Sequence, residues 1–293
     1  MMLILVGGLL LGEVPILYQP NAISAPVEAS VSRPFEVLDG TLYRSKPDLS
    51  SLGFKPLKII YVSEFGKDWS SGPTKMQLPP EDVVKQVART AAATESLVVI
   101  DIEHWPLAGS PSLVQESLDK YRRIATWFHE AASTMEIGFF GIVPRAAYGW
   151  SLKGADSWEY QSWQQVNETL APLAEKVDVM FPYAYTYYPD QAEWVRFATE
   201  NIKEARRYGK PVYVFLWPQY VDNAGKLAGK PVPEDYWKLQ LETVRKLADG
   251  MVIWGGWGPN GPEPWNEDAP WWKVTKRFLE RHPPQAPNSL KVR

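Results

Sequence analysis

Two acidic residues near the middle of the chain have the types and the spacing needed for acid–base chemistry. Asp101 and Glu103 end the run Leu97–Glu103 (LVVIDIE), which is apolar up to the first acid and is typical of a buried strand. Residues two apart on a strand point to the same face, so the carboxylates should lie about 5–7 Å apart, while Ile102 points away.

Two carboxylates at this distance cannot both ionise easily in a partly buried site. Desolvation and the neighbouring negative charge each raise a carboxyl pKa, so one group keeps its proton near neutral pH. Cleavage of a glycosidic bond requires an acid that protonates the leaving oxygen and a negative group that stabilises the charge on the sugar. A short Asp-x-Glu pattern also occurs where acids only cap helices or form ion pairs. The apolar strand before the pair and Trp105 after it favour the catalytic interpretation.

From Pro34 onward, the elements that must position the pair alternate between strands and helices. Short apolar runs predict strands over Phe35–Leu38, Leu57–Ser63, Leu97–Glu103, Glu136–Val143, Val177–Tyr183, Pro211–Trp217 and Met251–Trp254. Helical spacing of apolar residues predicts helices over Pro80–Thr94, Ser112–Ser133, Ser157–Lys176, Gln191–Tyr208, Glu234–Ala248 and Pro270–Arg281. This order predicts an α/β fold with a parallel sheet, either a (β/α) barrel of about seven to eight strands or an open doubly wound sheet.

The residues at the ends of the predicted strands favour the barrel. The sequence contains no GxxxxGK[ST] phosphate loop, which lowers the case for a nucleotide-binding open sheet. Carboxylates, Tyr and Trp come after the strands instead. In a barrel these residues converge on the C-terminal face, where active sites are built.

Composition narrows the chemistry further. The chain has 293 residues, of which 45% are hydrophobic, enough for a large core. Its net charge of -3, spread without long single-sign blocks, disfavours nucleic acid as a partner. Cysteine is absent and there are only three histidines, so we predict neither a metal site nor a cofactor. The 14 Trp and 14 Tyr residues favour a carbohydrate ligand, because Trp stacks on sugar faces.

The N-terminal residues predict export. Met1–Leu11 is apolar but too short to span a bilayer, and the small residues of Asn21–Ala25 offer a cleavage site. The expected location is therefore secreted or periplasmic. Because no Lys or Arg precedes the apolar run, a membrane anchor and a buried strand at Pro15–Tyr18 remain alternatives. The predicted organisation is a signal or anchor with a linker over 1–33, one catalytic barrel over 34–283 and a tail over 284–293.

Several strings, taken in order, resemble the hyaluronidase family of glycoside hydrolases. They are Pro34–Leu38 (PFEVL), Lys58–Ser63 (KIIYVS), Val99–Trp105 (VIDIEHW), Met180–Tyr185 (MFPYAY) and Val252–Gly256 (VIWGG). The resemblance implies a distorted barrel of about seven strands and substrate-assisted catalysis. Glu103 would be the acid and then the base, and Asp101 would orient the substrate's 2-acetamido group. The acetamido oxygen would attack the anomeric carbon, so configuration would be retained.

The departures from that family limit what carries over. Its Trp is followed by Arg-Pro, whereas Pro106 directly follows Trp105 here, so a groove arginine is missing. The slight excess of acidic over basic residues also disfavours polyanionic hyaluronan as the substrate. Barrel chitinases and muramidases carry related acid pairs, but position 99 is Val where chitinases have a further Asp. The mechanism therefore carries over more readily than the substrate.

Residues at the ends of the predicted strands, or in the segments after them, are the candidate substrate contacts. They are Tyr183, Tyr185, Trp254, Tyr148, Trp105, Trp217 and Glu64. Each has a plainer alternative: a packed Tyr with its hydroxyl in solvent, a Trp that fills the core, or, for Glu64, an acid that caps a helix.

The leading hypothesis is a retaining glycoside hydrolase whose substrate is an oligo- or polysaccharide containing N-acetylhexosamine. A non-catalytic carbohydrate-binding barrel is the alternative, and it would not need the acid pair. A metal-dependent barrel enzyme is disfavoured by the few histidines. The sequence does not predict the oligomeric state.

Overall fold

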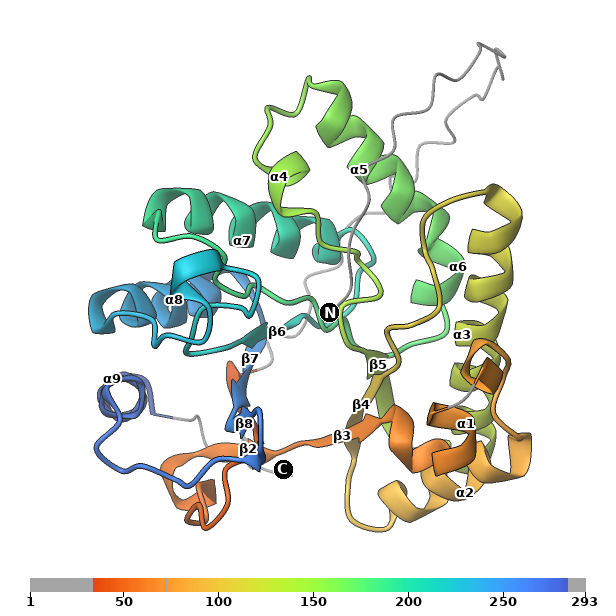
Figure 1. The fold of residues 1–293 in the computed structure, drawn as a ribbon, viewed down its shortest axis with the longest axis horizontal. Coiled ribbons are helices and arrows are strands. Elements are labelled where there is room, and N and C mark those ends of the chain that lie inside the picture. Colours follow the sequence, from red (N-terminus) through yellow and green to blue (C-terminus); the bar gives the residue numbers. More distant parts are fainter. Residues whose placement is uncertain (1–33, 72, 284–293) are drawn as a thin grey trace, which may run out of the picture. The chain divides into compact units, whose positions relative to one another are not determined.

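The computed structural model describes residues 34–71 and 73–283, in which strands and helices alternate (Figure 1). The parallel strands are β1 (Glu36–Thr41), β2 (Phe54–Pro56), β3 (Lys58–Tyr61), β4 (Leu97–Asp101), β5 (Glu136–Phe139), β6 (Tyr213–Leu216) and β7 (Gly250–Gly255). Two short strands after β7, β8 (Trp257–Gly258) and β9 (Gly261–Pro262), form an antiparallel pair.

The parallel strands are arranged in the order of a barrel. β1 lies between β2 and β7, β7 also pairs with β6, and β4 lies between β3 and β5. Only Leu57 separates β2 from β3, so residues 54–61 run first along β1 and then along β4. Within the described residues the ladders do not form one closed sheet. The predicted α/β barrel is confirmed, in a distorted form.

Residues 180–186 fill the position between β5 and β6, where the sequence predicts a strand over Val177–Tyr183. They contact the neighbouring strands through single bridges, such as Phe140 with Phe181 and Tyr183 with Phe215. Pro182 has no backbone N–H to donate, although its carbonyl accepts a hydrogen bond from the Phe215 amide at 2.8 Å. A continuous ladder therefore does not form there.

The longer helices agree with the predicted ones to within a few residues, with one exception. They are α2 (Glu81–Ala92), α3 (Pro111–Ala131), α5 (Trp158–Thr169), α7 (Gln191–Arg206), α8 (Glu234–Leu247) and α9 (Pro270–Arg281), and the shorter ones are α1 (Lys67–Ser71), α4 (Tyr148–Ser151) and α6 (Ala171–Ala174). The predicted helix Ser157–Lys176 divides into α5 and α6, because Pro172 lacks the N–H that would continue α5. The side chains of Ser110, Ser157 and Asp190 cap α3, α5 and α7.

The interior of the barrel is a small apolar cluster with members from most strands. It consists of Leu38, Ile59, Val99, Val179, Phe181, Tyr213, Phe215 and Val252. A larger cluster packs the outer faces of the strands against the helices and includes Val98 and Ile100 of β4. Because side chains alternate along a strand, Asp101 lies on the same inward face as Val99. The fold therefore brings the first acid to the mouth of the barrel.

Pro34 begins the compact unit that contains all of these elements. The predicted signal or anchor over 1–33 and the tail over 284–293 lie outside the described residues. Among the helices of 34–71 and 73–283, none is both long enough and apolar enough to cross a bilayer.

Gly138 of β5 is required where residues 177–183 approach that strand most closely. A Cβ atom at this position would lie 2.3 Å from the Val179 carbonyl oxygen and 2.6 Å from the Phe181 ring. The carbonyl belongs to the backbone and cannot move without shifting the whole segment.

We expect Gly138→Ala to lower the free energy of unfolding by about 1–3 kcal/mol, the usual cost of overpacking a well-packed interior. Gly154→Ala is the matched control, since no atom would lie within 4 Å of its Cβ. Urea denaturation of both variants and the wild type measures the difference. Equal stability of all three proteins would show that residues 177–183 do not approach Gly138 closely.

Candidate active site

Asp101 and Glu103 meet at the carboxyl end of β4. Asp101 is the last residue of the strand, and Glu103 lies just past it. Their side chains hydrogen-bond to each other, so the carboxyl groups converge more closely than the strand spacing predicts. Between them, Ile102 is fully buried on the other face, and its carbonyl accepts a hydrogen bond from the Tyr121 hydroxyl of α3 at 2.8 Å. Tyr121 thereby holds the end of the strand that presents both acids.

The pair retains a proton near neutral pH. Burial, together with the negative charge of Glu103 and the hydrogen bond between the two groups, raises the pKa of Asp101 to about 7. Burial also raises the pKa of Glu103, and the hydrogen bond from Asp101 opposes that rise. Glu103 is the more exposed of the two residues, so it faces the opening while Asp101 lies deeper. The pair combines a protonated and an ionised carboxyl group, as general acid catalysis requires.

A cavity of about 230 Å³ surrounds the acids at the mouth of the barrel. Residues from β3, β4, β6, β7 and the segments after the strands line it: Ile59, Tyr61, Asp101, Glu103, Phe140, Tyr185, Phe215, Trp217, Asp222 and Trp254. Of the residues predicted from the sequence, Asp101, Glu103, Tyr185, Trp217 and Trp254 are brought together here.

Aromatic rings form one wall of this cavity. The rings of Trp217 and Trp254 meet edge to face, with centroids 4.8 Å apart, and Tyr185 lies 5.5 Å from Trp217 and 6.2 Å from Trp254. The Trp254 indole N–H donates to the Tyr61 hydroxyl at 3.2 Å. Each ring restricts its neighbours, so the wall is preorganised to stack against an apolar face of a ligand.

Two glycines follow Trp254, and the second has a backbone conformation that favours glycine. Gly256 has φ +81°, and a Cβ there would lie 2.6 Å from the Tyr43 amide nitrogen, so only glycine fits. Gly256, Gly258 and Gly261 also have the GxGxxG spacing of dinucleotide-binding loops. Gly258 and Gly261 belong to the β8–β9 pair, however, and Gly256 comes just before it, while the next helix, α9, begins only at Pro270. This GxGxxG pattern therefore belongs to a turn and does not form a phosphate-binding site.

Tyr183 lies one layer away from the cavity. Its ring is 5.4 Å from that of Tyr185 and 5.7 Å from that of Phe140, both of which line the cavity. Its hydroxyl hydrogen-bonds to Tyr187, and burial raises its pKa, with the nearby charge of Glu103 adding to the effect. Tyr183 therefore supports the aromatic wall from behind.

Two residues expected to contact substrate, Trp105 and Glu64, do not line this cavity. Trp105 is only 1% exposed, and its indole N–H donates to the Lys75 carbonyl at 2.8 Å, so it is core and not a cavity wall. Glu64 accepts the Tyr61 amide N–H at 3.2 Å and pairs with Lys58 at 2.8 Å, which makes it the capping acid of the alternative interpretation.

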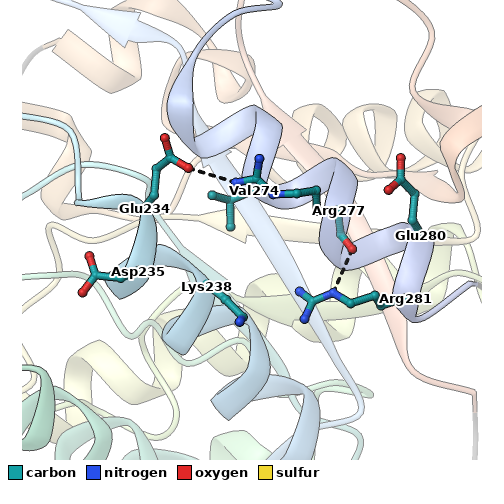
Figure 2. Close-up of a pocket in the computed structure, with 7 residues that line it drawn as sticks. All are labelled: Glu234, Asp235, Lys238, Val274, Arg277, Glu280 and Arg281. Carbon is teal, nitrogen blue, oxygen red and sulfur yellow. Dashed lines mark hydrogen bonds and ion pairs between the residues drawn. The ribbon is translucent and has the colours of Figure 1, made fainter.

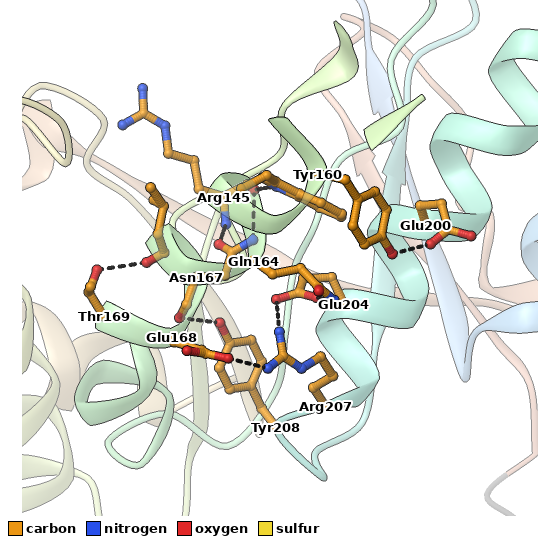
Figure 3. A network of polar contacts seen from close by, with 12 residues as sticks. Arg145, Tyr160, Gln164, Asn167, Glu168, Thr169, Glu200, Glu204, Arg207 and Tyr208 are labelled. Atoms are coloured by element: carbon orange, nitrogen blue, oxygen red, sulfur yellow. Dashed lines mark hydrogen bonds and ion pairs between the residues drawn. The ribbon is translucent and has the colours of Figure 1, made fainter. Parts of the chain in front are cut away.

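Tyr148 lies elsewhere, in a groove of about 690 Å³ between α3, α4 and α5 that shares no lining residue with the acid-pair cavity. A polar network packs α5 against α7 beside this groove (Figure 3). Trp163 donates to the Arg145 carbonyl at 2.7 Å, and Arg207 bridges Glu204 and Glu168 at 2.7 and 2.9 Å. The Trp163 contact thus holds the backbone at Arg145, shortly before α4 begins at Tyr148.

A third cavity, of about 580 Å³, lies between α8 and α9 (Figure 2). Its lining is mostly charged and of both signs, and Arg277 pairs with Glu234 at 2.9 Å. It contains no aromatic residue. It therefore lacks the wall and the acid pair that distinguish the cavity at the mouth of the barrel.

The sequence-based predictions missed Tyr61, Phe140 and Asp222. Tyr61 pairs with Asp101 across β3 and β4 and lies two residues after the inward-facing Ile59, so strand alternation could have identified it. Asp222 lies in the irregular segment after β6, where no periodic pattern indicates its direction. Among the described residues, His, Asp and Glu form no group of three placed to hold a metal ion.

Several solved structures with a similar fold are glycoside hydrolases. Bee venom hyaluronidase matches 85% of this chain and 98% of its own chain, with a TM-score of 0.55 and 14% identity. Its complex with a hyaluronic acid tetramer matches with a TM-score of 0.55 and 15% identity, over 84% of this chain and 95% of that one. An endo-β-1,4-mannanase of Cellulomonas fimi matches 79% of this chain and 55% of its own, with a TM-score of 0.53 and 13% identity.

No protein-family model matches the sequence, and no curated protein is similar to it. The chain therefore has the distorted TIM-barrel fold of these hydrolases at low sequence identity. This confirms, at the level of the fold, the distant resemblance to hyaluronidases seen in the sequence.

The raised pKa of Asp101 predicts how stability depends on pH. The folded protein holds this proton up to a pKa of about 7, whereas the ordinary value is 3.8, so the folded state binds more protons between these values. The stabilisation from this group is therefore complete below about pH 4 and is lost as the pH rises through about 7.

We expect the free energy of unfolding to fall less for Asp101→Asn than for the wild type as the pH rises from about 4 to above 7, because Asn cannot ionise. Urea denaturation at pH 4, 5.5, 7 and 8 measures the difference, and Asp156→Asn, at an exposed position, controls for the general charge change. The same dependence on pH in all three proteins would contradict the assignment.

Proposed function

We propose that the protein is a retaining glycoside hydrolase that acts on glycans containing N-acetylhexosamine by substrate-assisted catalysis. The observation that carries this proposal is the hydrogen-bonded Asp101–Glu103 pair inside a cavity walled by Tyr185, Trp217 and Trp254. The fold shared with a hyaluronidase and a mannanase supports the same reaction class. A carbohydrate-binding protein would need the aromatic wall but not a pair of acids that holds a proton.

The placement of the two acids supports the roles proposed for them. Glu103 faces the opening of the cavity, where a glycosidic oxygen would lie, and Asp101 lies deeper. When the N–H of a substrate acetamido group donates to Asp101, that carboxylate is best ionised, so the shared proton moves to Glu103. Glu103 is then the proton donor.

Cleavage would proceed without a nucleophile from the protein. The acetamido oxygen bonds to the anomeric carbon as the bond to the leaving oxygen breaks, and Glu103 gives its proton to that oxygen. Asp101 stabilises the positive charge on the cyclised sugar. Water then attacks the anomeric carbon from the face that the leaving group vacated, and Glu103 removes its proton. The bond from that carbon to the acetamido oxygen breaks at the same time, which restores the acetamido group. Two inversions leave the configuration retained.

Glu103→Gln should lower kcat by about 10²–10⁴-fold, because the variant cannot transfer the proton. The assay uses chitooligosaccharides, peptidoglycan fragments, chondroitin and hyaluronan, with the anomer of the first product determined by NMR. A thiazoline mimic of the cyclised intermediate should inhibit the wild type. If the wild type cuts none of these glycans and both proteins bind them equally, the protein is a carbohydrate-binding barrel and not a hydrolase.

Trp254→Ala should weaken glycan binding by about ten- to a hundredfold, because it removes a large apolar surface from the wall. Trp257→Ala is the matched control, since that ring is 53% exposed and does not line the cavity. Calorimetric titration of the Glu103→Gln protein with each second substitution measures the effect, and thermal unfolding checks the fold. Equal losses in both variants would argue against stacking on Trp254.

A further inference from the structure

The cavity around the acid pair contains a third carboxylate, that of Asp222. This residue lies in the segment between β6 and α8, and the chain on its N-terminal side is firmly held. The Val221 amide donates to the Thr186 carbonyl at 3.0 Å, and the Tyr220 amide donates to the Lys230 carbonyl at 2.9 Å. Both Tyr220 and Val221 are buried. The exposed Asp222 side chain is therefore presented to the cavity from an ordered backbone.

No positive side chain balances this carboxylate. In the part of the chain that the structure describes, Asp222 takes part in neither an ion pair nor a hydrogen bond through its side chain. Lys226 and Lys230 belong to the same segment but form no ion pair with it. Asp39, near the end of β1, differs in this respect, since Lys46 pairs with it at 2.6 Å.

The charge of the whole cavity is accordingly negative. Its described lining includes three carboxylates and no Lys, Arg or His. Because Asp101 and Glu103 keep one proton between them near neutral pH, about two negative charges remain. A sugar carboxylate entering this cavity meets repulsion from like charges, whereas a cation is attracted.

The aromatic wall favours the same kind of ligand. Trp217 and Trp254 line the cavity together with Asp222, and the faces of indole rings attract ammonium groups. A carboxylate and aromatic rings around one space together suit an alkylammonium ion. On a glycan, that group is the free amine of a hexosamine unit.

We propose that Asp222 determines specificity by binding the ammonium group of an unacetylated hexosamine next to the N-acetylhexosamine at which cleavage occurs. The substrates are then partly N-deacetylated amino-sugar glycans and not acidic glycosaminoglycans. This inference rests on the proposed function, because it names the substrate class of the same site.

Hydrolysis of matched oligosaccharides tests the inference. The probes are a fully acetylated chitooligosaccharide and one of equal length with alternating free amines. We expect the wild type to prefer the second by about tenfold in kcat/KM at low salt, with the preference shrinking as salt rises. Asp222→Asn should bring the ratio of the two values close to one. Asp156→Asn, which removes the same charge from an exposed position outside the cavity, should keep the wild-type ratio.

Other results overturn the inference separately from the proposed function. If the wild type cuts both probes equally and Asp222→Asn leaves the ratio unchanged, the glycosidase assignment stands and the role of Asp222 is wrong. If Asp222→Asn weakens cleavage of both probes alike, Asp222 binds neutral hydroxyl groups instead. Binding of both probes to Glu103→Gln, with and without Asp222→Asn, provides a readout without turnover. Equal binding of the two probes by Glu103→Gln refutes the charge preference even if no cleavage occurs.

Discussion

The hydrogen bond between Asp101 and Glu103 is the interaction around which the rest of the site is arranged. Two carboxyl groups in contact repel each other when both are ionised, so they stay together only where a proton is retained between them. Burial supplies that condition, because removal from water raises both pKa values. The pair therefore needs a site that shields the carboxyl groups from water and is open on one side.

The mouth of the barrel is such a place. Val99 fills the interior one step below Asp101, and strand alternation alone directs the acid inward above it. Ile102, buried on the outer face and held by Tyr121 of α3, prevents the end of the strand from rotating. The helix layer thus contributes to the chemistry by holding the backbone that carries the acids, although Tyr121 does not line the cavity.

The same aromatic packing has two effects on the site. Tyr185, Trp217 and Trp254 shield the acids from water, which raises their pKa values, and they also offer flat apolar faces to a sugar ring. Asp222 adds a third carboxylate to the lining of this site. Bee venom hyaluronidase, of similar fold, is known in complex with a hyaluronic acid tetramer. The cavity lining described here has three carboxylates and no Lys, Arg or His, so an anionic ligand would be repelled.

Local patterns in the sequence determined most of the helices and strands of this protein. These elements depend mainly on which residues lie close together along the chain. Apolar periodicity located the longer helices, and buried apolar runs located most of the strands. The spacing of Asp101 and Glu103 placed the two acids together. Tertiary structure decided the rest. Trp105 and Glu64 come after their strands as cavity residues would, yet hydrogen bonds to the Lys75 carbonyl and the Tyr61 amide commit them to the scaffold. Asp222 enters the cavity because the segment after β6 folds back onto Thr186, a contact between distant parts of the chain that no local pattern encodes.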